Sequence, residues 1–217
     1  MILALNTAEA VHELALLDGS TLLAESRWTN THEDVDNLVP SLQKLLDEKG
    51  LSKKDITQLV VLRGPGSYTS VRVGIAFVNG LKEGLGAELY EIDTFDFLKL
   101  KAARAEDVLV VLHAGGLDVG LRYKDEEKVG ALAPLLAAIP HGHELHVLAE
   151  LPPALMNELR SLALEKSWTL LEGHELQTLG ETLQTFGLSA FKKVDLAAPF
   201  YLRGPHITVP TDPWKKP

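Results

Sequence analysis

Residues 63–76 read RGPGSYTSVRVGIA, a glycine-rich turn that stands between an apolar run and a segment with helical periodicity. The run before the turn, residues 59–62, is continuously apolar, which is typical of a short strand buried on both faces of a sheet that helices cover. After the turn, apolar side chains recur at helical spacing over residues 71–81. The stretch therefore predicts a strand, a sharp turn and a helix in succession.

The turn, which we call the glycine loop, consists of Gly64, Pro65, Gly66, Ser67, Tyr68 and Thr69. Its glycines and proline allow the chain to turn sharply, and a hydroxyl group of Ser67, Thr69 or Ser70 can cap the helix that follows. A glycine loop that opens a helix is a potential anion site, because its N–H groups point outward. However, this loop has neither the spacing nor the lysine of a phosphate-binding P-loop.

Composition limits the classes of protein that the chain can represent. Its 217 residues, 46% of them hydrophobic and 24% charged, are enough for one large ordered domain or two small ones. The absence of cysteine excludes disulfides, a thiolate nucleophile and cysteine-bound zinc, and it is compatible with a reducing cytoplasm. The N-terminal residues lack the pattern of a signal peptide, and no apolar run has the length of a membrane span. We therefore expect a cytoplasmic protein that does not enter a membrane.

The charge balance argues against direct binding to a polyanion. The chain has 21 basic and 30 acidic side chains and a formal net charge of -9. A broad nucleic-acid surface is normally basic, so any role with nucleic acid is expected to act through a partner. Solubility alone is a sufficient explanation of the acidic balance.

The order of predicted elements indicates the fold. In the first half, strands are predicted at residues 2–5, 12–17, 21–26, 57–62 and 87–92, with helices at 35–46, 71–81 and 94–104. Pro40 is expected to kink or restart the first helix, and Thr94 to cap the third. In the second half, strands are predicted at 108–113, 117–123, 145–148 and 168–171, with helices at 129–138, 154–166 and 176–186.

An antiparallel meander followed by parallel strands and crossover helices is the ribonuclease-H-like arrangement. Two such units in tandem form an actin-like α/β fold of the ASKHA class, which sugar kinases also adopt. The second unit here is predicted to lack one strand. We expect an N-terminal lobe at residues 1–98 and a smaller, divergent second lobe at 99–204. Residues 205–217 are expected to form an extended or disordered tail.

Several short motifs resemble the bacterial TsaB (YeaZ) family, relatives of TsaD/Kae1 that were once grouped with glycoproteases. The most specific is the glycine loop with its continuation to Gly74. Weaker matches are the first strand with Asn6-Thr7, the pair His32-Glu33, and Tyr201-Leu202-Arg203 near the end. Residues 117–196 carry almost no matching motif, so the resemblance rests mainly on the first half.

The resemblance implies a non-catalytic subunit that supports formation of threonylcarbamoyladenosine in transfer RNA. In that family the chain pairs with TsaD, the catalytic subunit, and an ATPase subunit, TsaE, completes the bacterial set. No catalytic residue, metal or cofactor is implied for this chain, and contact with transfer RNA is expected only through the partner. Isolated family members self-associate through the same surface, so a homodimer through the N-terminal helices is also expected.

The two N-terminal helices carry the predicted partner surface. Each offers more apolar positions than one face of a small sheet can cover, so one stripe is available for an interface. The alternative is a single wide buried face. The predicted partner-binding residues are Val35, Leu38, Leu42, Val71, Arg72, Ile75, Val78 and Asn79.

Departures from the family pattern argue against metal and nucleotide chemistry. The first strand ends in Asn6 where an aspartate is usual, and the second-lobe strand ends in His113-Ala114-Gly115 where Asp-Ala-Arg is usual. Such aspartates hold a divalent ion in active members of the fold. His32 with Asp36 is an incomplete metal pair, and His141, His143 and His146 read as an exposed turn, so no metal site is predicted.

Two other functions stay open from the sequence. An actin-like ATPase or sugar-kinase-like phosphotransferase is compatible with the fold class, although Asn6 and His113 argue against it. A glycoprotease-like peptidase would use Ser67, but the flanking residues are not a G-x-S-x-G nucleophile elbow and no base is evident.

Overall fold

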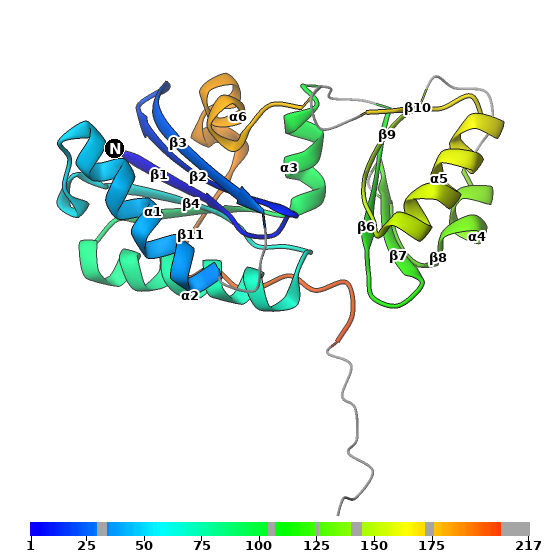
Figure 1. Cartoon of the computed structure of the whole chain (residues 1–217), viewed down its shortest axis with the longest axis horizontal. Coiled ribbons are helices and arrows are strands. Elements are labelled where there is room, and N and C mark those ends of the chain that lie inside the picture. Colours follow the sequence, from blue (N-terminus) through cyan, green and yellow to red (C-terminus); the bar gives the residue numbers. More distant parts are fainter. Residues whose placement is uncertain (30–33, 104–106, 125, 140–144, 172–175, 205–217) are drawn as a thin grey trace, which may run out of the picture.

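The computed structural model describes residues 1–29, 34–103, 107–124, 126–139, 145–171 and 176–204, with only the backbone described at 34–36. Figure 1 shows two lobes side by side, each built on one sheet. The first sheet has the strand order β11-β5-β4-β1-β2-β3, and the second has the order β10-β9-β6-β7-β8.

The first sheet begins with an antiparallel meander and continues with parallel strands. Its strands are β1 (Ile2–Asn6), β2 (Val11–Asp18), β3 (Thr21–Thr29), β4 (Gln58–Leu62), β5 (Glu88–Ile92) and β11 (Lys192–Val194). All of β1 and nearly all of β4 is buried, as their continuous apolar runs predict. Parallel strands at the centre of a sheet are covered on both faces, which explains why these runs do not alternate with polar residues.

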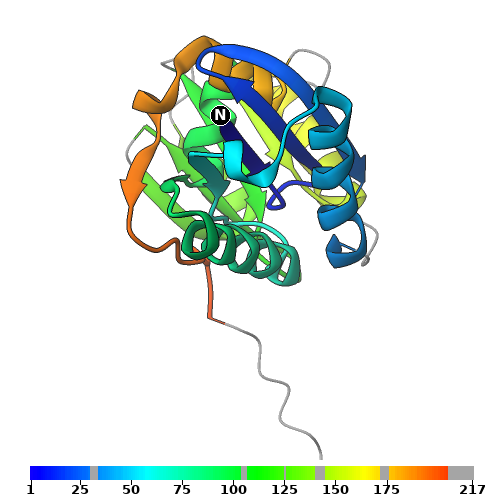
Figure 2. The same ribbon diagram turned by 90° about the vertical axis from the view of Figure 1, so that its left-hand side faces the viewer.

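Helices cover both faces of the first sheet (Figure 2). On one face lie α1 (Asp34–Lys49) and α2 (Tyr68–Leu85), and on the other lie α3 (Thr94–Lys101) and α6 (Leu179–Phe186). The α1 helix continues through Pro40. Asp93, and not Thr94 as predicted, caps α3, because the Asp93 side chain accepts a hydrogen bond from the backbone N–H of Asp96 (3.1 Å).

The second sheet repeats the strand order of the first. Its strands are β6 (Val108–His113), β7 (Asp118–Tyr123), β8 (Glu126–Ala131), β9 (His146–Glu150) and β10 (Thr169–Leu170), with α4 (Leu132–Ala137) and α5 (Pro153–Glu165) packed against them. The order β3-β2-β1-β4-β5 in one lobe corresponds to β8-β7-β6-β9-β10 in the other. This duplication confirms the predicted actin-like α/β fold.

The prediction that the second lobe lacks a strand is wrong, because β8 completes its meander. The strand reads EEKVGA and is exposed at nearly every position, so it has no apolar alternation by which to recognise it. The following helix accordingly begins at Leu132 and not at Val129.

The predicted lobe boundary also needs correction, because the chain returns to the first lobe after the second. The α6 helix packs on β1, β2 and β3, and β11 pairs with β5. Leu179, Leu183 and Phe191 are buried in the core of the first lobe. The second lobe therefore ends near Leu171, and residues 179–194 of the predicted range 99–204 belong to the first. The predicted tail, 205–217, lies outside the described residues.

A third, smaller core joins the lobes. Its buried members come from α3 of the first lobe and from β6 and β9 of the second: Phe95, Leu98, Val108, Val110, Leu112 and Leu148.

Two single-turn 3-10 helices, Lys53–Asp55 and Leu188–Ala190, complete the described elements. No described helix is both long and apolar enough to cross a membrane.

Candidate functional site

A cleft of about 1210 Å³ lies between the two lobes. The loops that follow the carboxyl ends of β1, β4, β6 and β9 line it, together with residues 200–204. Ligands of open α/β sheets bind at this edge. A related enzyme would therefore hold its substrate in this cleft. The residues that line the cleft show which groups of this chain a ligand would meet there.

The glycine loop packs against the turn that follows β1. A Cβ added at Gly66 would lie 2.1 Å from the carbonyl oxygen of Ala8, so only glycine fits at this position. The N–H of Ser67 points at the same oxygen (3.4 Å). Ser67 stands at the start of α2, and its hydroxyl hydrogen-bonds with that of Ser70 (3.0 Å). A backbone carbonyl of this chain thus occupies the space in front of the loop where an anion would lie.

The end of the motif has a similar explanation. The hydroxyl of Thr7 donates to the carbonyl oxygen of Ser70 in the first turn of α2 (2.8 Å). A Cβ at Gly74 would come within 2.2 Å of the Thr7 Oγ1. Glycine at this position therefore lets α2 approach the end of β1 closely.

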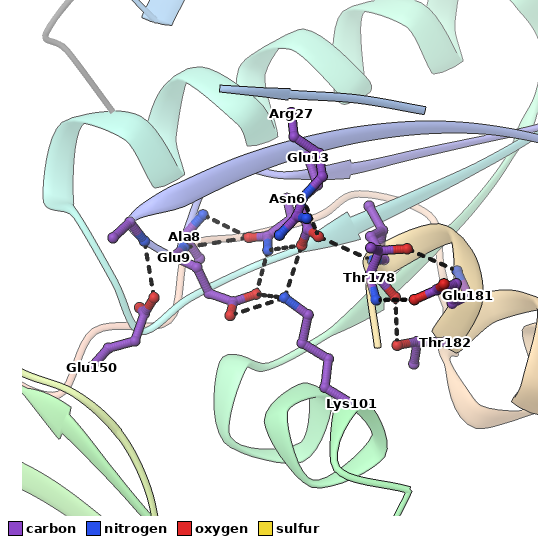
Figure 3. A network of polar contacts seen from close by, with 12 residues as sticks. Asn6, Ala8, Glu9, Glu13, Arg27, Lys101, Glu150, Thr178, Glu181 and Thr182 are labelled. Atoms are coloured by element: carbon purple, nitrogen blue, oxygen red, sulfur yellow. Dashed lines mark hydrogen bonds and ion pairs between the residues drawn. The ribbon is translucent and has the colours of Figure 1, made fainter. Parts of the chain in front are cut away.

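Asn6, at the end of β1, is held by hydrogen bonds within the chain (Figure 3). Its Oδ1 accepts from the N–H groups of Ala8 (3.0 Å) and Glu9 (3.3 Å). Its Nδ2 donates to the carboxylates of Glu9 and Glu13, the latter at 3.0 Å. An aspartate could not make the two donated bonds and would add a third negative charge beside two others. The residue that departs from the family pattern is therefore the one that fits this network.

The buried ammonium of Lys101 neutralises much of this carboxylate cluster. Its Nζ lies 3.0 Å from Glu9 Oε2 and 2.9 Å from Glu13 Oε2. Burial alone would lower the pKa of Lys101, but the charges of Glu9 and Glu13 outweigh it, so the pKa is raised. Burial raises the pKa of Glu9, and Lys101 offsets part of that rise. Lys101 and the two glutamates thus form a buried group whose charges are paired internally.

Carboxylates of the first sheet also occupy the N-terminus of α6. Glu13 Oε1 accepts from the N–H of Leu179 (3.2 Å), and Glu25 Oε1 accepts from the N–H of Gly180 (3.1 Å). Arg27 adds a positive charge 3.5 Å from Glu13 Oε1. A helix N-terminus favours anions, and here the anions belong to the chain itself.

Glu150 is the contribution of the second lobe to this cluster. Glu150 is the last residue of β9 and lines the cleft. Its Oε1 accepts a hydrogen bond from the N–H of Ala10 in the first lobe (3.0 Å). Burial, and then the charge of Glu9, raises the pKa of Glu150 to about 8. Most of this carboxyl is therefore protonated at neutral pH, so Glu150 adds little negative charge beside Glu9.

The second-lobe strand end lacks a comparable network. His113 ends β6 as an exposed residue whose Nε2 lies 3.1 Å from the carbonyl oxygen of Gly116. Within the described residues, no group of three or more histidine, aspartate or glutamate side chains could hold a metal ion. His146 is half-buried on β9. His32, the side chain of Asp36, His141 and His143 lie outside the described residues.

Most predicted partner-binding side chains are already buried in the core of the first lobe. These are Leu38, Leu42, Val71, Ile75 and Val78, each between 0% and 5% exposed. The second interpretation of the helices, a single wide buried face, is therefore the one that fits these positions. The side chain of Val35 lies outside the described residues.

The two polar residues of that prediction have different surroundings. Arg72 is exposed, and its guanidinium lies 4.2 Å from the ring centroid of Tyr68 while its Nε donates to the Tyr68 carbonyl oxygen (3.2 Å). Asn79 makes two hydrogen bonds with the backbone of Ala197, which occupy its amide. Arg72 is thus exposed to solvent, whereas the amide of Asn79 is used within the fold.

Other residues form the exposed faces of α1 and α2. Val39 on α1 is 48% exposed. On α2, Ala76 and Gly80 are exposed, and Val73 and Phe77 beside them are partly buried. Apolar periodicity gives the side chains of one face, but it does not say which of two neighbouring stripes the sheet covers. The structure places the predicted apolar residues of α1 and α2 that it describes against the sheet.

The strand order, the two lobes and the cleft between them define an actin-like protein. A family model described as tRNA N6-adenosine threonylcarbamoyltransferase, TsaD, matches residues 29–133. The tRNA threonylcarbamoyladenosine biosynthesis protein TsaB of Escherichia coli (strain K12) is 40% identical over 88 residues, which cover 41% of this chain and 37% of that protein. The TsaB protein of Bacillus subtilis (strain 168) is 29% identical over 97 residues, covering 45% and 42%. The chain thus spans less than half the length of these curated relatives in the matched regions.

Two solved structures from Pseudomonas aeruginosa resemble the whole chain. One is described as an uncharacterized protein with similarity to peptidase YEAZ and the other as YeaZ, with TM-scores of 0.71 and 0.65. Each is 23% identical and covers 93% of this chain and 99% of the solved one. They share the fold. The curated relatives confirm the resemblance of this chain to the TsaB (YeaZ) family.

Proposed function

We propose that this chain supports formation of threonylcarbamoyladenosine in transfer RNA as a non-catalytic subunit that binds a TsaD-type catalytic subunit. The similarity of part of the chain to proteins named TsaB carries the proposal. The match of residues 29–133 to the TsaD model supports it, since a chain related to the catalytic subunit can pair with it through equivalent surfaces.

The lining of the cleft is consistent with a supporting role. Asn6 is bonded to its own turn, and the carbonyl of Ala8 faces the glycine loop. Lys101 is paired with two glutamates. These first-lobe positions, where a phosphate or its metal ion could bind in this fold class, are thus satisfied by groups of the chain, and packing explains the glycine-loop motif.

The outer faces of α1 and α2 are the proposed contact surface. Val39, Val73 and Phe77 supply apolar area that a partner helix can desolvate, and Ala76 and Gly80 leave room for a close approach. Arg72 at the end of this face offers a charged contact to a partner carboxylate. The energy is expected to come from a few of these side chains and not from the total area.

The same surface would serve self-association, so a homodimer and the complex with the TsaD-type subunit are expected to compete. A TsaE-type ATPase would then join the assembled pair. Since the net charge of the chain is -9, the partner is expected to make the contacts with transfer RNA. The proposed place of action is the cytoplasm.

A binding experiment with one exposed substitution tests the surface. Ala76→Arg places a long side chain in the middle of the outer face of α2 without touching the core. Ala137→Arg, at an exposed helical position of the second lobe, is the matched control. We expect the first variant to bind a purified TsaD-type protein at least tenfold more weakly in calorimetry, and the control to bind like the parent. Equal binding by both variants would place the contact elsewhere.

A further inference from the structure

Residues 197–203 run from the first lobe back across the glycine loop to the second lobe. The segment begins beside α2, where the amide of Asn79 donates to the carbonyl oxygen of Ala197 (3.0 Å) and accepts from its N–H (3.1 Å). Further on, the N–H of Phe200 donates to the carbonyl oxygen of Arg63 (2.8 Å), and the guanidinium of Arg63 lies 5.0 Å from the Phe200 ring centroid. The segment is thus anchored at both ends of its first half.

The middle of the segment contacts the glycine loop. The ring of Tyr201 stacks on that of Tyr68, with centroids 4.6 Å apart and an angle of 29° between the planes. Arg72 lies against the same Tyr68 ring. The carbonyl oxygen of Phe200 lies so close to Gly64 that an added Cβ would come within 2.8 Å of it. These contacts fix the segment to the start of α2.

The last residues of the segment contact the second lobe. Leu202 lies against β7, where a Cβ added at Gly120 would come within 2.3 Å of its Cδ1. It also packs on the small core that joins the lobes. The guanidinium of Arg203 lies 2.7 Å from Asp118 Oδ2, which is on the same strand. The absence of a side chain at Gly120 therefore makes room for Leu202.

We propose that residues 197–203 form a strap that holds the two lobes in their present relative position, and that release of Leu202 and Arg203 from β7 lets the cleft between the lobes open. The part of the strap from Ala197 to Tyr201 is attached to the first lobe. Leu202 and Arg203 make the contacts with the second lobe, and an opening motion must break these contacts. Because the ion pair of Arg203 is partly exposed and screened by water, Leu202 provides the larger share of the hold.

This role is independent of the proposed function, because it depends only on contacts within the chain. It gives the Tyr201-Leu202-Arg203 motif a structural task. Tyr201 stacks on Tyr68 at the start of α2, and Leu202 and Arg203 contact β7 of the second lobe.

Distance measurements between the lobes test the strap. The chain has no cysteine, so Lys44→Cys and Leu164→Cys place one spin label on each lobe, at side chains that are 76% and 81% exposed. Two altered chains are then compared with the labelled parent. One carries Leu202→Ala with Arg203→Ala. The other carries Gly120→Ala, which displaces Leu202 from the opposite side.

We expect a single narrow distance distribution in the parent and at least a twofold broader distribution, or a second population, in both altered chains. Arg160→Ala, at an exposed position of α5, is the control and should match the parent. Circular dichroism shows which variants are folded. If a folded variant of either kind keeps the distribution of the parent, residues 202 and 203 do not hold the lobes and the proposal is overturned.

Discussion

The two lobes share one strand order but use their cleft edges differently. In the first lobe, the turn after β1 is tied down by Asn6, by the glycine loop and by the Glu9–Glu13–Lys101 cluster. In the second lobe, the corresponding turn after β6 carries an exposed His113 and a Leu117 that is 77% exposed. The same scaffold thus supports a densely bonded edge and an open one. The first-lobe edge of the cleft is thus a structural element, whereas the second-lobe edge is open to solvent.

The largest expected effect concerns the covered face of α2. Val71→Asp puts a charge into the core of the first lobe, where Val71 is 1% exposed, and should lower the free energy of unfolding by about 4 kcal/mol. Val39→Asp on the exposed face of α1 should change it by less than about 0.5 kcal/mol. Urea denaturation measures both. A Val71→Asp protein as stable as the parent would mean that the helix faces are assigned wrongly.

The next prediction removes the cation of the bonded edge. Lys101→Met leaves Glu9 and Glu13 buried without the ammonium that pairs with both, and should lower the free energy of unfolding by about 3 kcal/mol at pH 7. Lys124→Met on the second lobe, where the lysine is exposed, serves as the control and should cost less than about 0.5 kcal/mol. Equal costs in urea denaturation would remove the distinction between the two edges.

A third prediction compares an aspartate placed at the end of β1 with one placed at the end of β6. Asn6→Asp places an acid at the end of β1, but it loses two donated hydrogen bonds and adds charge beside Glu9 and Glu13. We expect a loss of about 2 kcal/mol of unfolding free energy at pH 7. His113→Asp at the open edge should stay within about 0.5 kcal/mol of the parent. Thermal and urea unfolding of the pair measure the difference, and the opposite ranking would contradict this account of Asn6.

The smallest effect is a pH dependence at the contact between the lobes. The folded pKa of Glu150 is about 8, above its ordinary value of 4.5, so its protonated form is favoured in the folded chain. Its contribution to stability is therefore complete at low pH and is lost as the pH rises toward 8. Between pH 7 and 8, Glu150→Gln should flatten the fall in unfolding free energy by about 1 kcal/mol relative to the parent. Parallel slopes for parent and variant over this range would refute the assignment.

The sequence predicted the central strands because burial on both faces leaves a clear pattern. Residues 59–62 and 108–112 are continuously apolar, and β4 and β6 lie where these runs predicted. The edge strand β8 was missed because its side chains are exposed and polar. The return of α6 and β11 to the first lobe was missed because local periodicity carries no information on which sheet a distant segment joins.

The site was predicted less completely than the fold. The glycine loop and Asn6 were recognised as motif positions, but the partners that explain them are distant in sequence, and Lys101 lies 92 positions from Glu9. No spacing rule connects such residues. A buried charged residue can be suspected only from a lysine on an apolar helix face, and Lys101 follows Phe97, Leu98 and Leu100 in this way.

The proposed function is tested most directly by a reconstituted assay of threonylcarbamoyladenosine formation on transfer RNA. TsaD-type and TsaE-type proteins are combined with this chain, with its Ala76→Arg variant, or with no third protein. We expect modification to rise at least tenfold with the parent chain and to remain at the background level with the variant. Equal modification with and without this chain would contradict its role as a supporting subunit.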